Sequence, residues 1–145
     1  MEFNENESSI FCKLLEAGHS VSIVPKGTSM LPLLDGKSDS VIIDPVGEAV
    51  RKNDIVFYTD KSSRLVVHRI WGKNEDGFIL LGDGNIEKEF SIQEQDIHGV
   101  CSKIIRGGKE IPVSSFGYRI YASLWRLLYP FRRYILILIN FFNKG

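Results

Sequence analysis

The sequence predicts a mostly β fold: a coiled, barrel-like sheet with a short helix before it and a long amphipathic helix after it. Two observations support this prediction. Between residues 20 and 114, short apolar runs alternate with turns, as in sheets built from hairpins. From residue 117 onward, the apolar residues change to helical spacing. The length of 145 residues suits one globular domain, as do 43% hydrophobic and 25% charged residues.

The elements can be placed one by one from their patterns. We expect a helix at 8–17 and strands at 20–25, 40–43, 54–59, 64–71, 78–81, 96–105 and 110–113. Gly18 ends the helix, loop 60–63 makes a hairpin of the third and fourth strands, and Gly107-Gly108 turns into the last strand. The chain thus divides into a lead-in at 1–19, a β domain at 20–114 and a C-terminal helix at 115–145.

The C-terminal segment differs from the rest in charge. After Glu110 it contains five basic residues and no acidic one, and it holds nine of the sixteen aromatic residues. The residues that repeat every seven positions form one polar stripe, namely Arg119, Arg126, Arg133 and Asn140. Pro130 should kink this helix or start a second one. The longest apolar run, Tyr134–Ile139, is far shorter than the roughly 20 residues of a membrane span.

Two interpretations of this helix remain open. Residues 117–142 could lie in a membrane interface, with arginines at anionic headgroups and Trp125, Tyr129 and Tyr134 at the boundary. Alternatively, the helix covers the β core and keeps its arginines in water. The N-terminus is acidic and has no apolar segment typical of an export signal, so we expect the cytoplasmic side of the membrane.

Other classes of partner and cofactor are not favoured. The basic residues lie among apolar ones and form no separate charged face, so no nucleic acid is expected. Cys12 and Cys101 form no CxxC pair and have no histidine at metal-ligand spacing, so we expect buried free thiols and no metal.

The stretch Lys26–Leu34 presents one hydroxyl, that of Ser29, between a glycine and a proline. A serine becomes a nucleophile when a base takes its proton. His68, in the middle of an apolar strand, is the best candidate base, although a core histidine is the alternative. Asp83, between two glycines, is the best candidate to orient the imidazole, although a turn aspartate is equally consistent with the pattern.

Five segments, in order, resemble the conserved boxes of signal peptidase I and its LexA-like relatives. They are Gly27-Thr28-Ser29-Met30-Leu31-Pro32, Asn53-Asp54-Ile55-Val56-Phe57, Val67-His68-Arg69-Ile70, Leu81-Gly82-Asp83-Gly84-Asn85 and Asp96-Ile97-His98-Gly99-Val100. The histidine box is similar to that of the archaeal and endoplasmic-reticulum branch, where histidine replaces a lysine base. The resemblance implies Ser29 as nucleophile, His68 as general base and Asp83 as the orienting acid, with Glu87 or Glu89 as alternatives for the acid.

The resemblance also implies a function. It indicates a serine endopeptidase that cleaves extended leader or signal peptides and needs no metal or organic cofactor. Gly27 stands where the family often has a hydroxyl for the oxyanion, so backbone N–H groups, including that of Ser29, would form the hole. Two alternatives are a LexA-like self-cleaving protease and a catalytically silent peptide-binding module.

Overall fold

The computed structural model describes residues 5–143 and shows an eight-stranded antiparallel sheet with three α-helices. The strands are β1 (Val21–Ile23), β2 (Ser40–Pro45), β3 (Ile55–Thr59), β4 (Leu65–Asn74), β5 (Gly77–Leu81), β6 (Glu89–Ile92), β7 (Ile97–Arg106) and β8 (Lys109–Pro112). Their order is β1-β2-β7-β3-β4-β5-β6, and β8 pairs with β7. A short 3₁₀ turn, Glu94–Asp96, precedes β7.

The mostly β prediction is confirmed, but the sheet is not a closed barrel. In the described part of the chain its two ends, β1 and β6, pair only with β2 and β5. The strand β6, which pairs Ile92 with Phe78 and Glu89 with Leu80, is not among the predicted strands. This strand is four residues long and lacks a run of apolar residues, so its sequence carries little β signal.

The hydrophobic core lies in two clusters around the central strand β3. Phe57 faces a cluster that includes Leu15 of the first helix, α1 (Glu5–Glu16), and the ring of Phe11 lies edge-on to Phe57. Tyr58 faces a second cluster, with Ile70 and residues of β5 and β6. Because strand side chains alternate between faces, covering both sides buries Ile55 to Tyr58 almost completely.

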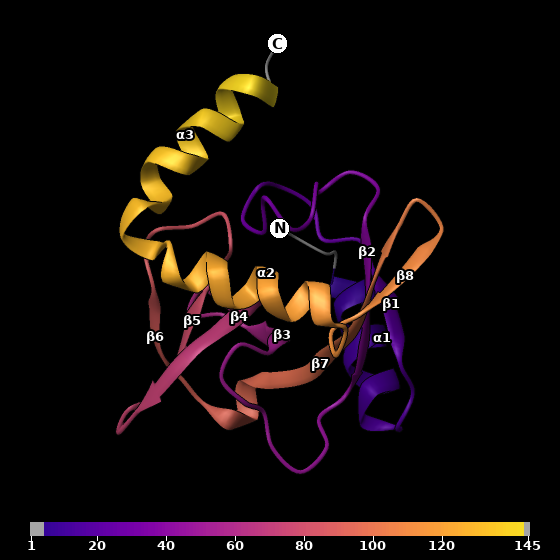
Figure 1. Cartoon of the computed structure of the whole chain (residues 1–145). Coiled ribbons are helices and arrows are strands. Elements are labelled where there is room, and N and C mark those ends of the chain that lie inside the picture. The colour runs from indigo at the N-terminus through magenta and orange to yellow at the C-terminus, as the bar shows by residue number, and fades with distance from the viewer. Residues whose placement is uncertain (1–4, 144–145) are drawn as a thin grey trace.

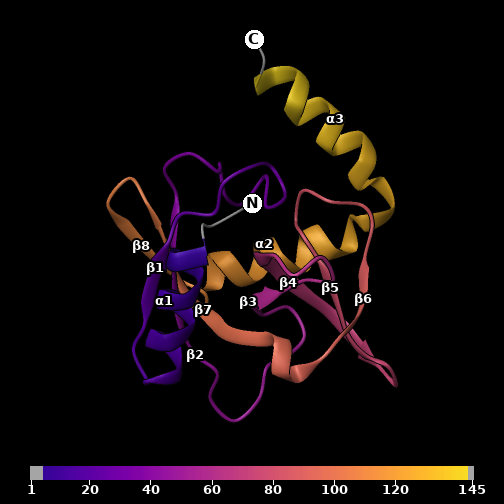
Figure 2. The same ribbon diagram turned by 180° about the vertical axis from the view of Figure 1, so that it is seen from behind.

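Two C-terminal helices stand where the sequence predicted one kinked or divided helix. The helix α2 (Phe116–Leu127) is followed by a 3₁₀ turn, Tyr129–Phe131, and then α3 (Arg132–Asn143). Pro130 lies in this turn, which confirms the expected break. Figures 1 and 2 show α2 lying along the sheet and α3 leaving the body of the molecule. No described helix is long and apolar enough to cross a membrane.

Candidate active site

Ser29 lies in the loop between β1 and β2, whose ends meet. Gly27 and Gly36 both have positive φ, and a Cβ on Gly36 would clash with the carbonyl oxygen of Gly27. Within the loop, Met30 and Leu34 are buried and point into the core. The buried side chains of Met30 and Leu34 therefore anchor the loop, in which Ser29 is partly buried.

The segment Gly82-Asp83-Gly84 packs directly against this loop. The Gly84 N–H donates to the Ser29 carbonyl oxygen at 2.8 Å, and the Asp83 N–H lies 3.4 Å from the Met30 sulfur. A Cβ on Gly82 would clash with the Ser29 carbonyl oxygen and come within 3.0 Å of His68 Cδ2. The Ser29 carbonyl oxygen and the His68 ring thus lie against the same side of Gly82, where a side chain would have no room.

The structure brings the Ser29 loop and His68 together without joining their functional atoms. Ser29 Oγ makes no hydrogen bond in the part of the chain that the structure describes, and neither does His68 Nε2. Nucleophile–base hydrogen bonds are often long or misaligned in enzymes without substrate. The His68 Cδ2 atom, which is bonded to Nε2, faces Gly82 and the Ser29 loop.

The other ring nitrogen of His68 has a partner that the sequence analysis did not identify. His68 Nδ1 lies 3.0 Å from the hydroxyl of Tyr58, on the adjacent strand β3. Burial lowers the pKa of His68 to about 4, although the nearby charges of Asp83 and Asp60 act in the opposite direction. The imidazole is therefore neutral at pH 7, which is the form a general base requires.

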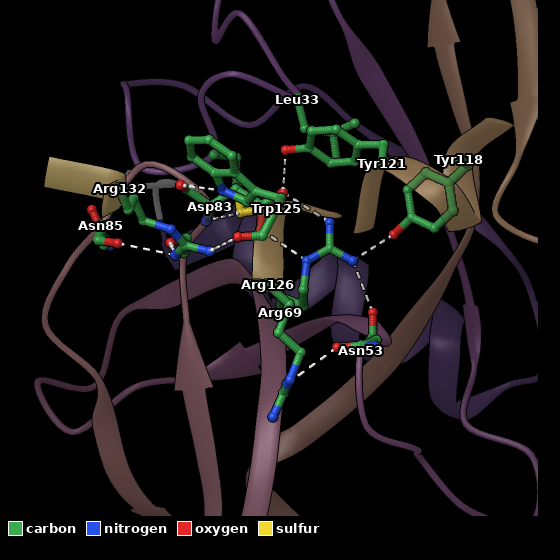
Figure 3. Close-up of polar contacts among 12 residues, drawn as sticks. Leu33, Asn53, Arg69, Asp83, Asn85, Tyr118, Tyr121, Trp125, Arg126 and Arg132 are labelled. Atoms are coloured by element: carbon green, nitrogen blue, oxygen red, sulfur yellow. Dashed lines mark hydrogen bonds and ion pairs between the residues drawn. The ribbon is translucent and has the colours of Figure 1, made fainter. Parts of the chain in front are cut away.

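Asp83 occupies a different position from the one expected of an orienting acid. Its two carboxylate oxygens accept hydrogen bonds at 2.8 Å from Arg69 Nε and Nη2, and Tyr121 adds a third at 2.8 Å (Figure 3). Burial alone would lower the pKa of Arg69, but the charge of Asp83 raises it above the usual value. The Asp83 carboxylate makes no hydrogen bond to His68 among the described residues; it forms a buried ion pair instead.

The two glutamates held open as alternatives also separate in the structure. Glu89 Oε1 accepts from the Tyr58 hydroxyl at 2.6 Å, and its Oε2 accepts from the Lys61 N–H at 3.1 Å. Glu87 is exposed and has no hydrogen-bond partner among the described residues. Of the three acids, only Glu89 connects to His68 through hydrogen bonds, and it does so through Tyr58.

The C-terminal helices clamp the same glycine segment. Tyr118 Oη accepts from Arg69, Trp125 donates to the Asp83 carbonyl, and Arg132 reaches the carbonyl oxygens of Gly82 and Asn85 (Figure 3). This finding corrects the expected membrane contacts of two side chains. Trp125 of α2 and Arg132 of α3 are both buried and cannot meet headgroups, because Trp125 packs inward and Arg132 is held by carbonyl oxygens of the Gly82–Asn85 segment.

Arg126 also departs from the predicted polar stripe. Its guanidinium lies 4.0 Å from the centre of the Trp71 ring, and it donates to the Trp71 carbonyl and to Asn53 Oδ1. Arg119 and Arg133 of that stripe remain exposed. The arginines of the predicted stripe therefore differ in their surroundings: Arg126 contacts the sheet, whereas Arg119 and Arg133 face solvent.

No group of three or more metal-ligating side chains occurs among the described residues, and Cys12 and Cys101 are free. His98, in the last of the five boxes, bonds to Thr59 and packs edge-on against Phe57 in the core. The comparisons with known proteins returned no matching family model, no matching curated protein and no matching solved structure. Any function must therefore be argued from the residues and their geometry.

Proposed function

We propose that this protein is a serine endopeptidase of the signal-peptidase type, with Ser29 as nucleophile and His68 as general base. The observation that carries the proposal is the close approach of the Ser29 loop and the His68 ring, which both lie against the open Cβ position of Gly82. A neutral imidazole whose Nε2 has no hydrogen bond among the described residues is what the chemistry needs. The order and content of the five boxes add support.

The reaction follows from these roles. His68 Nε2 accepts the Ser29 proton as Oγ attacks the peptide carbonyl carbon. The substrate carbonyl oxygen becomes an oxyanion, which the Ser29 N–H stabilises by a hydrogen bond. The imidazolium then gives that proton to the leaving amine, and the C–N bond breaks to leave an acyl-enzyme. In the second step, His68 takes a proton from water, which attacks the ester carbonyl. The imidazolium then gives that proton to Ser29 Oγ as the ester bond breaks.

The proposed substrate is the leader or signal peptide of a membrane-bound or exported chain, and the exposed helical surface supports this setting. On α2, apolar side chains follow one face at positions 116, 120, 124 and 127, and they stay exposed. On α3 the exposed apolar residues are Tyr134, Ile137, Leu138, Phe141 and Phe142. With exposed Arg119 and Arg133 and no acid after Glu110, this surface suits an anionic bilayer, such as a cytoplasmic leaflet.

The position of α3 also links that surface to the site. Ile139 lines one surface pocket together with Leu31 and Pro32, which come two and three residues after Ser29 in the chain. A bilayer that receives α3 would therefore lie close to the Ser29 loop. That arrangement suits a substrate whose leader continues into a membrane segment.

The enzyme assignment is tested with a fluorophosphonate probe and with peptides that carry small residues at the cleavage point. We expect labelling and cleavage that disappear in Ser29→Ala and are strongly reduced in His68→Ala. Cleavage confined to this chain's own backbone would favour the self-cleaving alternative. No Ser29-dependent labelling or cleavage in a folded protein would leave the silent peptide-binding module.

Membrane binding is tested by flotation with vesicles that contain anionic phospholipid. We expect the double variant Ile137→Ser/Phe141→Ser to bind about tenfold less or weaker still, because each buried apolar side chain contributes roughly 1.5–3 kcal/mol. Phe90→Ser is the matched control, since Phe90 is 51% exposed but lies on β6. Equal flotation of the double variant would contradict the membrane proposal while leaving the peptidase proposal intact.

A further inference from the structure

We propose that Tyr58 and Glu89 form a positioning pair that fixes His68 in the Nδ1–H tautomer, so that Nε2 is the nitrogen left to accept the Ser29 proton. This inference deepens the proposed peptidase function and rests on it for its catalytic consequence. It assigns to a tyrosine and a glutamate the task that a directly bonded aspartate performs in a Ser-His-Asp site. The tautomer itself can be measured without any substrate.

The direction of the two hydrogen bonds determines the tautomer. A glutamate carboxylate has no proton to give, so in the 2.6 Å contact the Tyr58 hydroxyl must donate to Glu89 Oε1. Tyr58 has one hydroxyl proton, and it is now committed. In the 3.0 Å contact with His68, the tyrosine oxygen can therefore only accept, and Nδ1 must carry the ring proton.

The surroundings hold this chain of bonds in place. The Tyr58 side chain is fully buried in the second core cluster, so its hydroxyl has little freedom to turn away. Burial and the adjacent Glu89 raise the pKa of Tyr58, so the hydroxyl keeps its proton. The second oxygen of Glu89 is held by the Lys61 N–H in the β3–β4 turn. Each atom of the relay thus has a single role.

Asp83 cannot do this work from its present position. Arg69 and Tyr121 take its carboxylate oxygens, and its charge reaches His68 only through space. That charge favours an imidazolium as it forms, whereas the choice of protonated nitrogen falls to Tyr58. The two tasks of an orienting acid are therefore divided between two sites.

Glu89→Gln offers a sharp test, because it should reverse the relay without emptying it. The Lys61 N–H needs an acceptor, so the amide oxygen of Gln stays there and its NH₂ faces Tyr58. The tyrosine oxygen then accepts from the amide and donates its own proton to His68 Nδ1. The ring proton must move to Nε2, which can no longer act as the base.

The tautomer is read from two-bond proton–nitrogen correlations of the imidazole ring in ¹⁵N-labelled protein at about pH 7, where His68 is neutral. We expect Nδ1–H in the natural sequence, Nε2–H in Glu89→Gln and a mixture or Nε2–H in Tyr58→Phe. Glu87→Gln removes the same charge two positions away and should leave Nδ1–H unchanged. An Nε2–H imidazole in the natural sequence, or no change in Glu89→Gln, would overturn the inference.

Kinetics provide the second arm. Tyr58→Phe and Glu89→Gln should each lower kcat about 10²-fold, within the range that general-base catalysis contributes, with KM nearly unchanged. Circular dichroism verifies that each variant is folded. Retention of kcat within twofold in both variants would overturn the positioning role. The absence of Ser29-dependent activity in the natural sequence would instead contradict the proposed function. The tautomer measurement would still show whether Tyr58 and Glu89 set the protonated nitrogen of His68.

Discussion

Two polar networks lie close to Gly82, and they differ in whether every polar atom has a hydrogen-bond partner. In the Asp83 network, both carboxylate oxygens are bonded, Arg69 uses all three of its nitrogens, and the partners are strongly buried. In the Tyr58 network, a chain of neutral and charged groups ends at His68 Nε2, which has no described partner. The first network is closed and stabilises the fold, whereas the second leaves one ring nitrogen of His68 without a hydrogen bond among the described residues.

The difference teaches how a site can separate stability from chemistry. A closed ion pair holds α2, β4 and the glycine segment in register, but it has no proton to exchange at neutral pH. An open hydrogen-bonded chain contributes less to stability, yet it presents a nitrogen with a free lone pair. Substitutions should therefore separate the two networks: loss of the first should strongly lower the free energy of unfolding, and loss of the second should leave the protein folded but slow.

The largest effect is expected from Asp83→Ala. Removing the carboxylate leaves Arg69 buried and uncompensated, which costs about 3–5 kcal/mol of the free energy of unfolding. Urea denaturation measures the loss. The matched control is Glu110→Ala, which breaks the exposed Lys103–Glu110 pair and should cost no more than about 1 kcal/mol. A small change in stability combined with loss of activity would instead make Asp83 the orienting acid of His68.

The second effect concerns Gly82, which packs against both the Ser29 loop and the His68 ring. In Gly82→Ala, the new Cβ meets the Ser29 carbonyl oxygen and the His68 ring, so the Ser29 loop must shift. A misplacement of about 1 Å can reduce turnover about 10²-fold. Gly47→Ala is the control, because a Cβ there meets nothing within 4 Å. Peptide cleavage rates compare the two variants, and an unchanged rate in Gly82→Ala would argue against Ser29 and His68 acting across this segment.

The sequence predicted more of the fold than of the polar networks around Asp83 and His68. Seven of the eight strands and the break at Pro130 were predicted, because apolar periodicity and proline act locally. The pairing of Tyr58 with His68 depends on strand register. Since Val56 pairs with His68, Tyr58 becomes its diagonal neighbour on the same face. A shift of one residue would have put the two side chains on opposite faces.

The contacts of Arg69, Arg126 and Arg132 with the sheet and its loops could not be predicted either. The partners of these arginines there lie 14 to 73 residues away in the chain, and no local sequence pattern indicates a carboxylate or carbonyl at that distance. Heptad spacing placed Arg126 with Arg119 and Arg133, yet the structure packs Arg126 on Trp71. The sequence therefore predicted amphipathic helical structure but could not show which of its arginines would contact the sheet.

The smallest effect is expected in the pH dependence of kcat/KM. Because His68 is buried, kcat/KM should hardly change over the range in which an ordinary histidine would become protonated. A base with the ordinary histidine pKa of 6.5 would lose about 25-fold in kcat/KM between pH 7 and about pH 5. Because burial lowers the pKa of His68 to about 4, its neutral form persists, and kcat/KM should fall less than twofold over that range. The steep loss should come only as the pH falls through about 4.

Stability sets the lower limit of this measurement. The folded pKa of His68 lies below the unfolded one, so the unfolded chain binds a proton that the folded chain does not. The contribution of His68 to the free energy of unfolding is therefore fully present above pH 6.5 and declines as the pH falls toward 4. Circular dichroism at each pH separates unfolding from protonation of the base. Because kcat/KM reports the free enzyme, a profile with its midpoint near 6.5 in folded protein would contradict the burial of His68 as the cause of a lowered pKa.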